Sequence, residues 1–218
     1  MRIGTWNLDG RWTSEHHGLI QRQDCDVWLL TEVNAGVVLT GYQGHVTVHE
    51  MAPQRRWAGV YSRTGLQALP DPHPAGAMAT VDGITFCSPI LPWRSCGTTE
   101  PWVGDNHDQR VTSTLDQLRP QLPQRDLVWG GDWNQGFVGR EYVGSRVGRA
   151  SLHDLVDHLS LVIATAELPS QCDGSVTIDH IALPKDTTAS QPTRINAAGL
   201  SDHDMYVVDV SRTETPPK

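Results

Sequence analysis

One short segment in the middle of the chain constrains the fold more than any other. Val128–Trp129 is an apolar run that enters Gly130–Gly131 and ends in Asp132-Trp133-Asn134. Side chains two positions apart in an extended strand point the same way, so Asp132 and Asn134 are predicted to project together from one strand end. The glycines before them permit unusual dihedral angles and the close approach of a ligand. Asp and Asn also crowd ordinary turns, so the segment indicates a site only if partners exist elsewhere in the chain.

The bulk composition is compatible with one domain. A chain of 218 residues with 38% hydrophobic residues can form one sizeable core, or at most two small domains. We predict one domain over residues 1–212 and a polar, disordered tail over 213–218. The formal net charge of −8 argues against a protein that coats nucleic acid through bulk positive charge. It permits a metal-dependent enzyme that neutralises a phosphate locally.

The cysteines and the start of the chain bear on compartment. The four cysteines, at positions 25, 87, 96 and 172, show neither a Cys-x-x-Cys pair nor zinc-site spacing. We expect reduced and mostly buried thiols, although Cys87 and Cys96 could pair in an oxidising compartment. No leader or membrane-length apolar run is visible, and the first predicted strand starts at Arg2. The expectation is a cytoplasmic protein without a membrane segment; no sequence feature fixes an oligomeric state.

Short strands outnumber helices along the chain. Alternating or continuous apolar runs predict strands at 2–7, 27–32, 45–49, 56–62, 77–81, 84–90, 127–129, 177–183 and 206–210. Helices are predicted at 15–23 after Thr13 or Ser14, at 109–118 before Pro120, and from Ser151 through Leu159. Residues 92–107 form a long irregular loop of the kind that is often functional. These elements indicate one mixed α/β domain.

Polar side chains of similar type recur at the predicted strand ends. The set comprises acids, amides and one histidine: Asn7, Glu32, Asp132, Asn134, Asp179, Asp202 and His203. Strand ends gather at one edge of a sheet, where ligands of α/β proteins bind preferentially. Oxygen-rich donors suit a hard divalent cation such as Mg²⁺, whereas zinc would require more His or Cys. The chemistry indicated is metal-assisted attack of water on a phosphate ester.

The order of these residues resembles that of a known family. The matching motifs span nearly the whole chain: Thr5-Trp6-Asn7, Asp26–Glu32, Gly131–Asn134, Ile178–Ile181 and Ser201–His203. They are similar to those of the endonuclease/exonuclease/phosphatase superfamily, which includes exonuclease III-like abasic-site nucleases, deoxyribonuclease I, sphingomyelinases and inositol polyphosphate 5-phosphatases. The resemblance implies an α/β (α+β) fold, a four-layer sandwich of two mixed β-sheets flanked by helices.

The resemblance also implies a metal site. Glu32 corresponds to the principal ligand of Mg²⁺ or Mn²⁺, with Asn7 and Asp202 near the metal or its waters. Asp132 would orient and deprotonate the attacking water, and Asn134 would hold that water or a phosphate oxygen.

A histidine and a carboxylate complete the implied machinery. His203 would contact the scissile phosphate, with Asp179 paired to it. A nearby carboxylate raises the pKa of a histidine and fixes its orientation, so a protonated His203 would stabilise charge on phosphoryl oxygens. His180 follows Asp179, should face away from it, and is interpreted as structural.

The chain departs from the family pattern at one strand. Family members usually place a His or Tyr at the end of the strand that corresponds to 85–93, and neither stands there. Arg94 or His107, in the loop after this strand, could supply the missing donor. The departure bears on contacts to phosphate or leaving group and leaves the metal site intact.

Several peripheral residues could bind substrate. Trp93 and Trp102 could stack on a base, or could simply cover a core. The loop after Asn134 contains Arg140, Arg146 and Arg149, which could bind a phosphate backbone. Gln54-Arg55-Arg56 could extend that basic path. Alternatively, these arginines could be solvated surface charge. The remaining histidines are predicted to lie on the surface or on helix faces: His16, His17, His45, His49, His73, His153 and His158.

The favoured hypothesis is a divalent-metal-dependent phosphodiester hydrolase acting on nucleic acid, a DNA endonuclease or exonuclease. The alternative is a phosphatase or phosphodiesterase on a small or lipid phosphate ester, which would use the same residues. A binding module without activity would not need the intact acid set.

Overall fold

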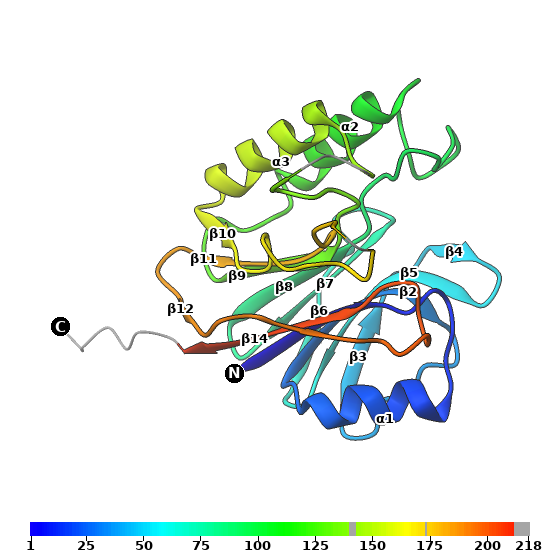
Figure 1. Cartoon of the computed structure of the whole chain (residues 1–218), viewed down its shortest axis with the longest axis vertical. Helices are drawn as coiled ribbons and strands as arrows, with labels where there is room; N and C mark the ends of the chain where they lie inside the picture. Colours follow the sequence, from blue (N-terminus) through cyan, green and yellow to red (C-terminus); the bar gives the residue numbers. More distant parts are fainter. Residues whose placement is uncertain (140–142, 173, 212–218) are drawn as a thin grey trace.

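Two mixed β-sheets packed face to face organise the molecule (Figure 1). A computed structural model describes residues 1–139, 143–172 and 174–211 of the chain. Within this part, one sheet has eight strands and the other six. The predicted domain end at residue 212 and the predicted tail lie outside the described residues.

The eight-stranded sheet carries the N-terminal half of the predicted site. Its order is β12 (Thr188–Ala189), β14 (Met205–Ser211), β1 (Arg2–Asn7), β2 (Val27–Asn34), β5 (Arg55–Ser62) and β3 (Gln43–Val46), with β13 (Thr193–Ile195) on β14 and β4 (Glu50–Ala52) on β5. The β1–β2 pair is parallel, so their carboxyl ends lie at the same edge.

The six-stranded sheet carries the C-terminal half. Its order is β10 (Leu161–Ile163), β11 (Asp179–Pro184), β9 (Leu127–Asp132), β8 (Ile84–Pro89), β7 (Gly76–Val81) and β6 (Leu66–Ala68). β9 runs antiparallel to β11 with Asp132 directly opposite Asp179, so the end of one strand meets the start of the other.

Three apolar layers hold the sandwich together. The central one, between the sheets, is built from buried β-branched and aromatic residues such as Val60, Phe86 and Ile181. A second layer joins the eight-stranded sheet to α1 (Ser14–Gln23), and a third joins the six-stranded sheet to α2 (His107–Leu118) and α3 (Arg146–His158). The helices thus lie on the two outer faces, which confirms the predicted four-layer α/β sandwich (Figure 1).

The helix predictions hold except at one boundary. Thr13 caps α1 as predicted, accepting a hydrogen bond from the backbone of His16. The third helix begins at Arg146 rather than after Ser151, because Ser145 is its N-cap and accepts from the Gly148 amide. The prediction chose the wrong serine, and Ser151 lies in the helix interior.

One strand prediction needs correction, and several short strands were not predicted. The alternating run at 45–49 is not one strand: β3 ends at Val46, and Thr47 accepts the Trp57 amide through its side chain before β4 begins at Glu50. The short β6, β10, β12 and β13 were not predicted, because segments of two or three residues carry too little periodicity. Residues 92–106 are irregular, as predicted.

Two of the histidines predicted to lie on the surface or on helix faces are buried in the core. His16 is buried, stacks on Trp6, and bonds Thr13 Oγ1 (2.8 Å) and the Leu200 carbonyl (3.1 Å) through its ring nitrogens. His73 is buried and stacks on Trp102. Both sit beside tryptophans, whose faces cover the rings.

The cysteines are all unpaired. Cys25 and Cys87 are buried, Cys96 is half-buried and Cys172 is exposed, so the pairing of Cys87 with Cys96 does not occur. No helix in the described part of the chain is long and apolar enough to cross a membrane.

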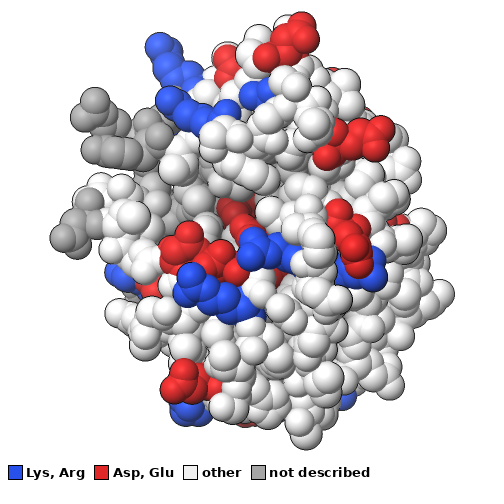
Figure 2. All heavy atoms as spheres, turned by 90° about the vertical axis from the view of Figure 1, so that its right-hand side faces the viewer, with Lys and Arg blue, Asp and Glu red and all other residues white. Residues whose placement is uncertain are grey.

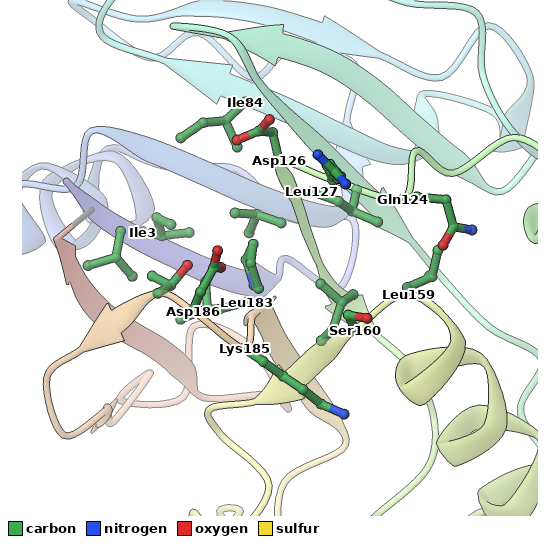
Figure 3. A pocket seen from close by; sticks show the side chains of 16 residues that line it. Ile3, Ile84, Gln124, Asp126, Leu127, Leu159, Ser160, Leu183, Lys185 and Asp186 are labelled. Atoms are coloured by element: carbon green, nitrogen blue, oxygen red, sulfur yellow. The ribbon is translucent and has the colours of Figure 1, made fainter. Parts of the chain in front are cut away.

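A cavity of about 830 Å³ opens at one end of the sandwich (Figure 3). Its walls include Ile3 of β1, Leu127 of β9 and Leu183 of β11. These residues stand at the opposite ends of the strands that carry Asn7, Asp132 and Asp179. This cavity is therefore remote from the predicted chemistry.

Candidate active site

The predicted polar residues converge where the two sheets meet at one edge. β1 contributes Asn7, β2 contributes Glu32, and the paired ends of β9 and β11 contribute Asp132 and Asp179. The face at this end of the molecule is hollowed, and acidic and basic side chains lie side by side there (Figure 2).

Asn7 joins the two sheets. Its amide nitrogen donates to Glu32 Oε1 at 3.1 Å and to Asp132 Oδ2 at 3.0 Å. Its amide oxygen accepts the Asp9 backbone N–H at 2.9 Å, which fixes the orientation of the amide group. Because Asn does not titrate, this buried side chain can donate to both carboxylates whatever the pH, as long as they are ionised.

Glu32 lies in a strained backbone conformation. Its φ of +48° is in the left-handed region, which a residue with a Cβ adopts at a cost of about 1 kcal/mol or more. The side chain is held from two sides, by Asn7 at Oε1 and by Arg55 Nη1 at Oε2, 2.6 Å away. Strain of this kind concentrates at functional sites.

Asp132 is buried and shares its oxygens between two donors. Asn7 donates to Oδ2, and the Asn134 backbone N–H donates to Oδ1 at 3.0 Å. Burial, reinforced by repulsion from Asp179, raises the pKa of Asp132 to about 7. A carboxylate with a pKa in this range is a stronger base than an ordinary one.

The local geometry of Asn134 differs from the strand prediction. Asn134 has a φ of +51°, and its side-chain amide donates to the Leu91 carbonyl at 3.0 Å. β9 ends at Asp132, so the alternation of an extended strand does not extend to Asn134. A turn, rather than a shared strand face, brings its backbone N–H to Asp132.

His203 and Asp179 form a hydrogen-bonded pair. His203 Nδ1 lies 2.7 Å from Asp179 Oδ2. Burial disfavours the imidazolium, but the Asp179 carboxylate outweighs it and raises the pKa of His203 well above its usual value. His203 is therefore held protonated near neutral pH and can donate from Nε2.

Backbone contacts fix the His203 loop against β1. Trp6 Nε1 donates to the His203 carbonyl at 2.9 Å, and Ser201 Oγ donates to the Asn7 carbonyl at 2.7 Å. The histidine is thus placed by the strand that also carries Asn7.

The donor set fits a hard divalent cation. Ligand atoms of Asp132, Asp179 and His203 all lie within 4.8 Å of one another. Asp179 Oδ1 is buried and has no hydrogen-bond partner among the described residues, a costly state that a cation would relieve. A metal-bound histidine must be neutral, whereas His203 is held protonated, so the carboxylate oxygens are the better donors. Oxygen donors of this kind match Mg²⁺ or Mn²⁺.

The structure leaves Asp202 outside this cluster. Its side chain is 75% exposed, and its Oδ1 lies 3.9 Å from His203 Nε2. The acid that is buried in this loop is Asp204, which accepts from Arg194 at 2.5 Å and from the Ala197 amide at 2.9 Å.

The residues proposed to replace the missing His or Tyr have other partners. Arg94 donates through Nε and Nη2 to the Gly144 carbonyl, at 2.9 and 2.6 Å. A ring nitrogen of His107 lies 3.0 Å from the Pro92 carbonyl. The Arg94 contact ties the loop to residue 144, the His107 contact joins the start of the loop to the start of α2, and neither contact reaches the acid cluster.

The two loop tryptophans mostly build a core. Trp102 is 3% exposed and packs against Trp57 and Ile90, so it cannot stack on a base. Trp93 is half-buried against the same cluster.

The arginines after Asn134 do not all lie in a loop. Arg146 is the first residue of α3 and is exposed. Arg149, also in the helix, donates to the Gly139 carbonyl at 3.3 Å. Arg140 lies outside the described residues.

The glycines before Asp132 serve packing rather than ligand approach. A Cβ on Gly130 would lie 2.6 Å from the His180 carbonyl oxygen, and one on Gly131 would lie 2.4 Å from the Pro89 carbonyl oxygen. Neighbouring backbone, not substrate, occupies the space that these residues leave open.

Sequence reasoning missed Arg55 as a site residue. It was interpreted as part of a basic surface path, whereas its guanidinium contacts Glu32 Oε2. No motif marks it; only the pairing of β5 with β2, which sets Arg55 opposite Asn34, brings it to Glu32.

A cavity of about 370 Å³ adjoins the Asp179–His203 pair. Val176, Ile178 and Tyr206 contribute apolar wall, and Ser170 and Gln171 contribute polar groups. It provides a mixed apolar and polar surface beside His203.

Solved structures with similar folds identify the architecture. The chain is similar to the endonuclease domain of TRAS1, a telomere-specific non-LTR retrotransposon, with a TM-score of 0.73 and 15% identity over 97% of both chains. It is similar to the AP endonuclease LMAP from Leishmania major, with a TM-score of 0.68 and 14% identity over 97% of this chain and 87% of that one. A third similar structure is an endonuclease/exonuclease/phosphatase from Beutenbergia cavernae, with a TM-score of 0.64 and 14% identity over 97% and 71%.

No protein-family model and no curated protein sequence matches the chain. At such low identities the likeness lies in the arrangement of the strands and helices. The residues of the predicted motifs lie at one edge of the sandwich. The chain has the fold of the endonuclease/exonuclease/phosphatase superfamily.

Proposed function

We propose that the protein is a divalent-metal-dependent phosphodiester hydrolase, and that its substrate is nucleic acid, with DNA favoured. The single observation that carries the proposal is the convergence of Glu32, Asp132 and the Asp179–His203 pair at one edge of the sandwich. Three acids and a protonated histidine gathered at one edge form a site with a base, an electrophilic donor and oxygen ligands for a cation.

The protonation states of Asp132 and His203 give them different roles. Asp132, with a pKa raised to about 7 by burial, is the base that takes a proton from the attacking water. His203, held protonated by Asp179, donates from Nε2 to a phosphoryl oxygen on which charge develops. Asn134 borders the same space and would orient the water or a phosphate oxygen.

The carboxylates of Glu32 and Asp179 are the residues that would hold the cation, and Asn7 positions Glu32 beside the base Asp132. When bound, Mg²⁺ or Mn²⁺ supplies Lewis-acid polarisation of the phosphate and neutralises its charge. We propose Mg²⁺ as the usual metal because the donors are oxygens and the histidine is protonated. The exposed side chain of Asp202 would reach the ion only through water.

Two features favour a polymer over a small ester. The two similar structures that are endonucleases by name, TRAS1 and LMAP, have TM-scores of 0.73 and 0.68, whereas Sphingomyelinase C from Streptomyces griseocarneus has 0.53. The face of the molecule in Figure 2 is also hollowed, with acidic and basic side chains side by side, which suits a polymer better than a closed cavity would. A phosphatase or lipid phosphodiesterase is the second candidate, favoured by the small, partly apolar cavity beside His203.

The unpaired cysteines suit a reducing compartment such as the cytoplasm.

The test compares substrates and metals directly. Wild-type protein and the Asp132→Ala variant are incubated with supercoiled plasmid, single-stranded RNA and a generic phosphodiester, each with Mg²⁺, Mn²⁺ or EDTA. We expect plasmid cleavage that requires a metal and that falls by at least about 100-fold in the variant. Circular dichroism and the melting temperature establish that the variant is folded.

Each other outcome has a defined meaning. Hydrolysis of the generic ester without cleavage of either nucleic acid would select the second candidate. Cleavage that persists in EDTA contradicts the role of a metal, and full activity of Asp132→Ala contradicts the site.

A further inference from the structure

Arg55 occupies a site that the fold has built for it. Its Nη1 donates to Glu32 Oε2 at 2.6 Å and its Nη2 donates to the Asp9 carbonyl at 3.0 Å. The side chain passes over Gly10, where a Cβ would lie 2.0 Å from Arg55 Nε. Gly10 is itself fixed, because its amide donates to the Glu32 carbonyl and its carbonyl accepts from Asn34 Nδ2.

This contact differs from a surface ion pair. The Arg55 side chain is 31% exposed and that of Glu32 is 19% exposed, so both ends are mostly removed from water. Two hydrogen bonds anchor the guanidinium, and a strained residue with φ +48° presents the carboxylate to it. Side chains of this kind are positioned by the surrounding backbone rather than by mutual attraction alone.

The charges at the edge are unevenly compensated. Asp179 is paired with His203, and Glu32 is paired with Arg55. Asp132 has only neutral donors, the side-chain amide of Asn7 and the backbone N–H of Asn134. With Arg55 present, the ionised edge has a net charge of about −1; without it, the charge would be about −2, which a divalent cation would neutralise fully.

We propose that Arg55 is a positioning residue that serves as the resident counter-ion of Glu32, and so limits the affinity of the site for a divalent cation. The inference rests on the proposed metal-dependent function. The guanidinium engages Oε2 of Glu32 and leaves Oε1, beside Asn7, as the oxygen that would bind a cation. It keeps the acidic edge compensated when no cation is bound, and a weaker-held cation is released more readily.

The experiment measures binding of Mn²⁺ by the free-ion signal in electron paramagnetic resonance, at fixed pH and ionic strength. Arg55→Gln removes the charge but keeps a hydrogen-bond donor, and Arg55→Lys keeps the charge. The matched control is Arg63→Gln, because Arg63 is 32% exposed and pairs with Asp24 beyond the other end of β5. It makes the same change in net charge away from the site.

We expect Arg55→Gln to bind Mn²⁺ with a Kd about five-fold or more below that of wild type, while Arg55→Lys and Arg63→Gln stay close to wild type. In a Glu32→Gln background, Arg55→Gln should no longer tighten binding, because the carboxylate that it exposes is absent. In EDTA, Arg55→Gln should melt below Arg63→Gln, and Mn²⁺ should close that gap.

Unchanged or weaker Mn²⁺ binding by Arg55→Gln overturns the counter-ion role, even if the wild type cleaves its substrate. Tightening of equal size in Arg55→Lys also overturns it, since the charge would then not be the cause. Absence of Mn²⁺ binding by the wild type is a different result, because it removes the metal site on which the proposed function depends.

Discussion

Asp132 illustrates how burial changes the chemistry of an ordinary residue. The same carboxyl in a surface turn would ionise at acidic pH, but removal from water and the nearby Asp179 raise its pKa to about 7. The turn at Asn134 and the amide of Asn7 nevertheless give it two donors. The environment of Asp132 therefore makes it a stronger base while still stabilising the ionised carboxylate that accepts the proton.

Asp179 should act through His203. Asp179→Asn keeps the size of the side chain but removes the negative charge that holds His203 protonated. We expect phosphodiester hydrolysis to fall by at least about 100-fold and the pKa of His203 to fall, because the largest influence that opposes burial is then removed. Activity assays and an NMR titration of the His203 ring in metal-free protein measure both effects. His153→Asn, a change on α3, is the control; an unchanged His203 titration in Asp179→Asn would contradict the pairing.

His73 should make the protein sensitive to acid. Burial lowers its pKa to about 4, below the value near 6.5 of an unfolded histidine. Between pH 6.5 and pH 4 the unfolded chain binds more protons than the folded protein. The contribution of neutral His73 to the free energy of unfolding is therefore fully present above pH 6.5, and it declines by roughly 3 kcal/mol as the pH falls toward 4. Urea denaturation from pH 7 to 4.5 measures this slope.

In the His73→Asn variant, the amide oxygen can still accept the Ala75 N–H that His73 Nδ1 accepts at 3.1 Å. The acid-dependent loss should therefore be smaller in this variant than in the wild type. His49→Asn, at an exposed position, should leave the slope unchanged. Equal slopes in all three proteins would show that His73 does not titrate on unfolding.

At the scale of secondary-structure elements, the close packing of β9 against the end of β8 requires a glycine. Gly131 has a φ of +132°, and a Cβ there would lie 2.4 Å from the Pro89 carbonyl oxygen. Gly131→Ala should therefore push β9 away from the end of β8 and cost well over 1 kcal/mol. Urea denaturation measures the loss. Gly65→Ala is the matched control, since nothing lies within 4 Å of its Cβ position, and should change stability by less than about 0.5 kcal/mol. A Gly131→Ala variant as stable as Gly65→Ala would rule out the close approach.

Element prediction succeeded where the signals are local. The predicted strands 77–81 and 84–90, which match β7 and β8 closely, and the Thr13 cap of α1 involve residues a few positions apart. The α3 boundary failed because Ser145 and Ser151 are both plausible caps, and contacts with distant residues decide between them. Gln135 Oε1 accepts the Ser145 amide at 2.9 Å, a contact across ten positions that no propensity encodes.

At the scale of the whole molecule, the site depends on both sheets remaining packed. Phe86 lies fully buried in the layer between them, so Phe86→Ala should cost about 3–5 kcal/mol. Urea unfolding followed by tryptophan fluorescence and by far-ultraviolet circular dichroism should shift together to lower denaturant. Two separate transitions, or a loss confined to one probe, would show that the sheets are independent. Val48→Ala, at an exposed position, is the control.

The candidate site could be predicted because its residues are polar side chains at the ends of apolar strands. Asn7, Glu32 and Asp132 meet as expected, and the parallel pairing of β1 with β2 brings the first two to one edge. The loop candidates were less predictable. Trp102 entered a core and Arg94 bonded the Gly144 carbonyl, because long loops are placed by packing that leaves no periodic trace.

The amino-acid sequence was sufficient to predict the order of the motifs and the oxygen-rich character of the site, because polar residues at the ends of apolar strands are visible in short segments. The resemblance of those motifs to the endonuclease/exonuclease/phosphatase superfamily implied the sandwich fold. The tertiary structure was needed to establish that Arg55 pairs with Glu32, that Asp202 faces outward and that His73 and His16 are buried. These outcomes depend on the register between strands and on which faces are covered. Residues far apart in sequence settle both, so no single segment contains the information.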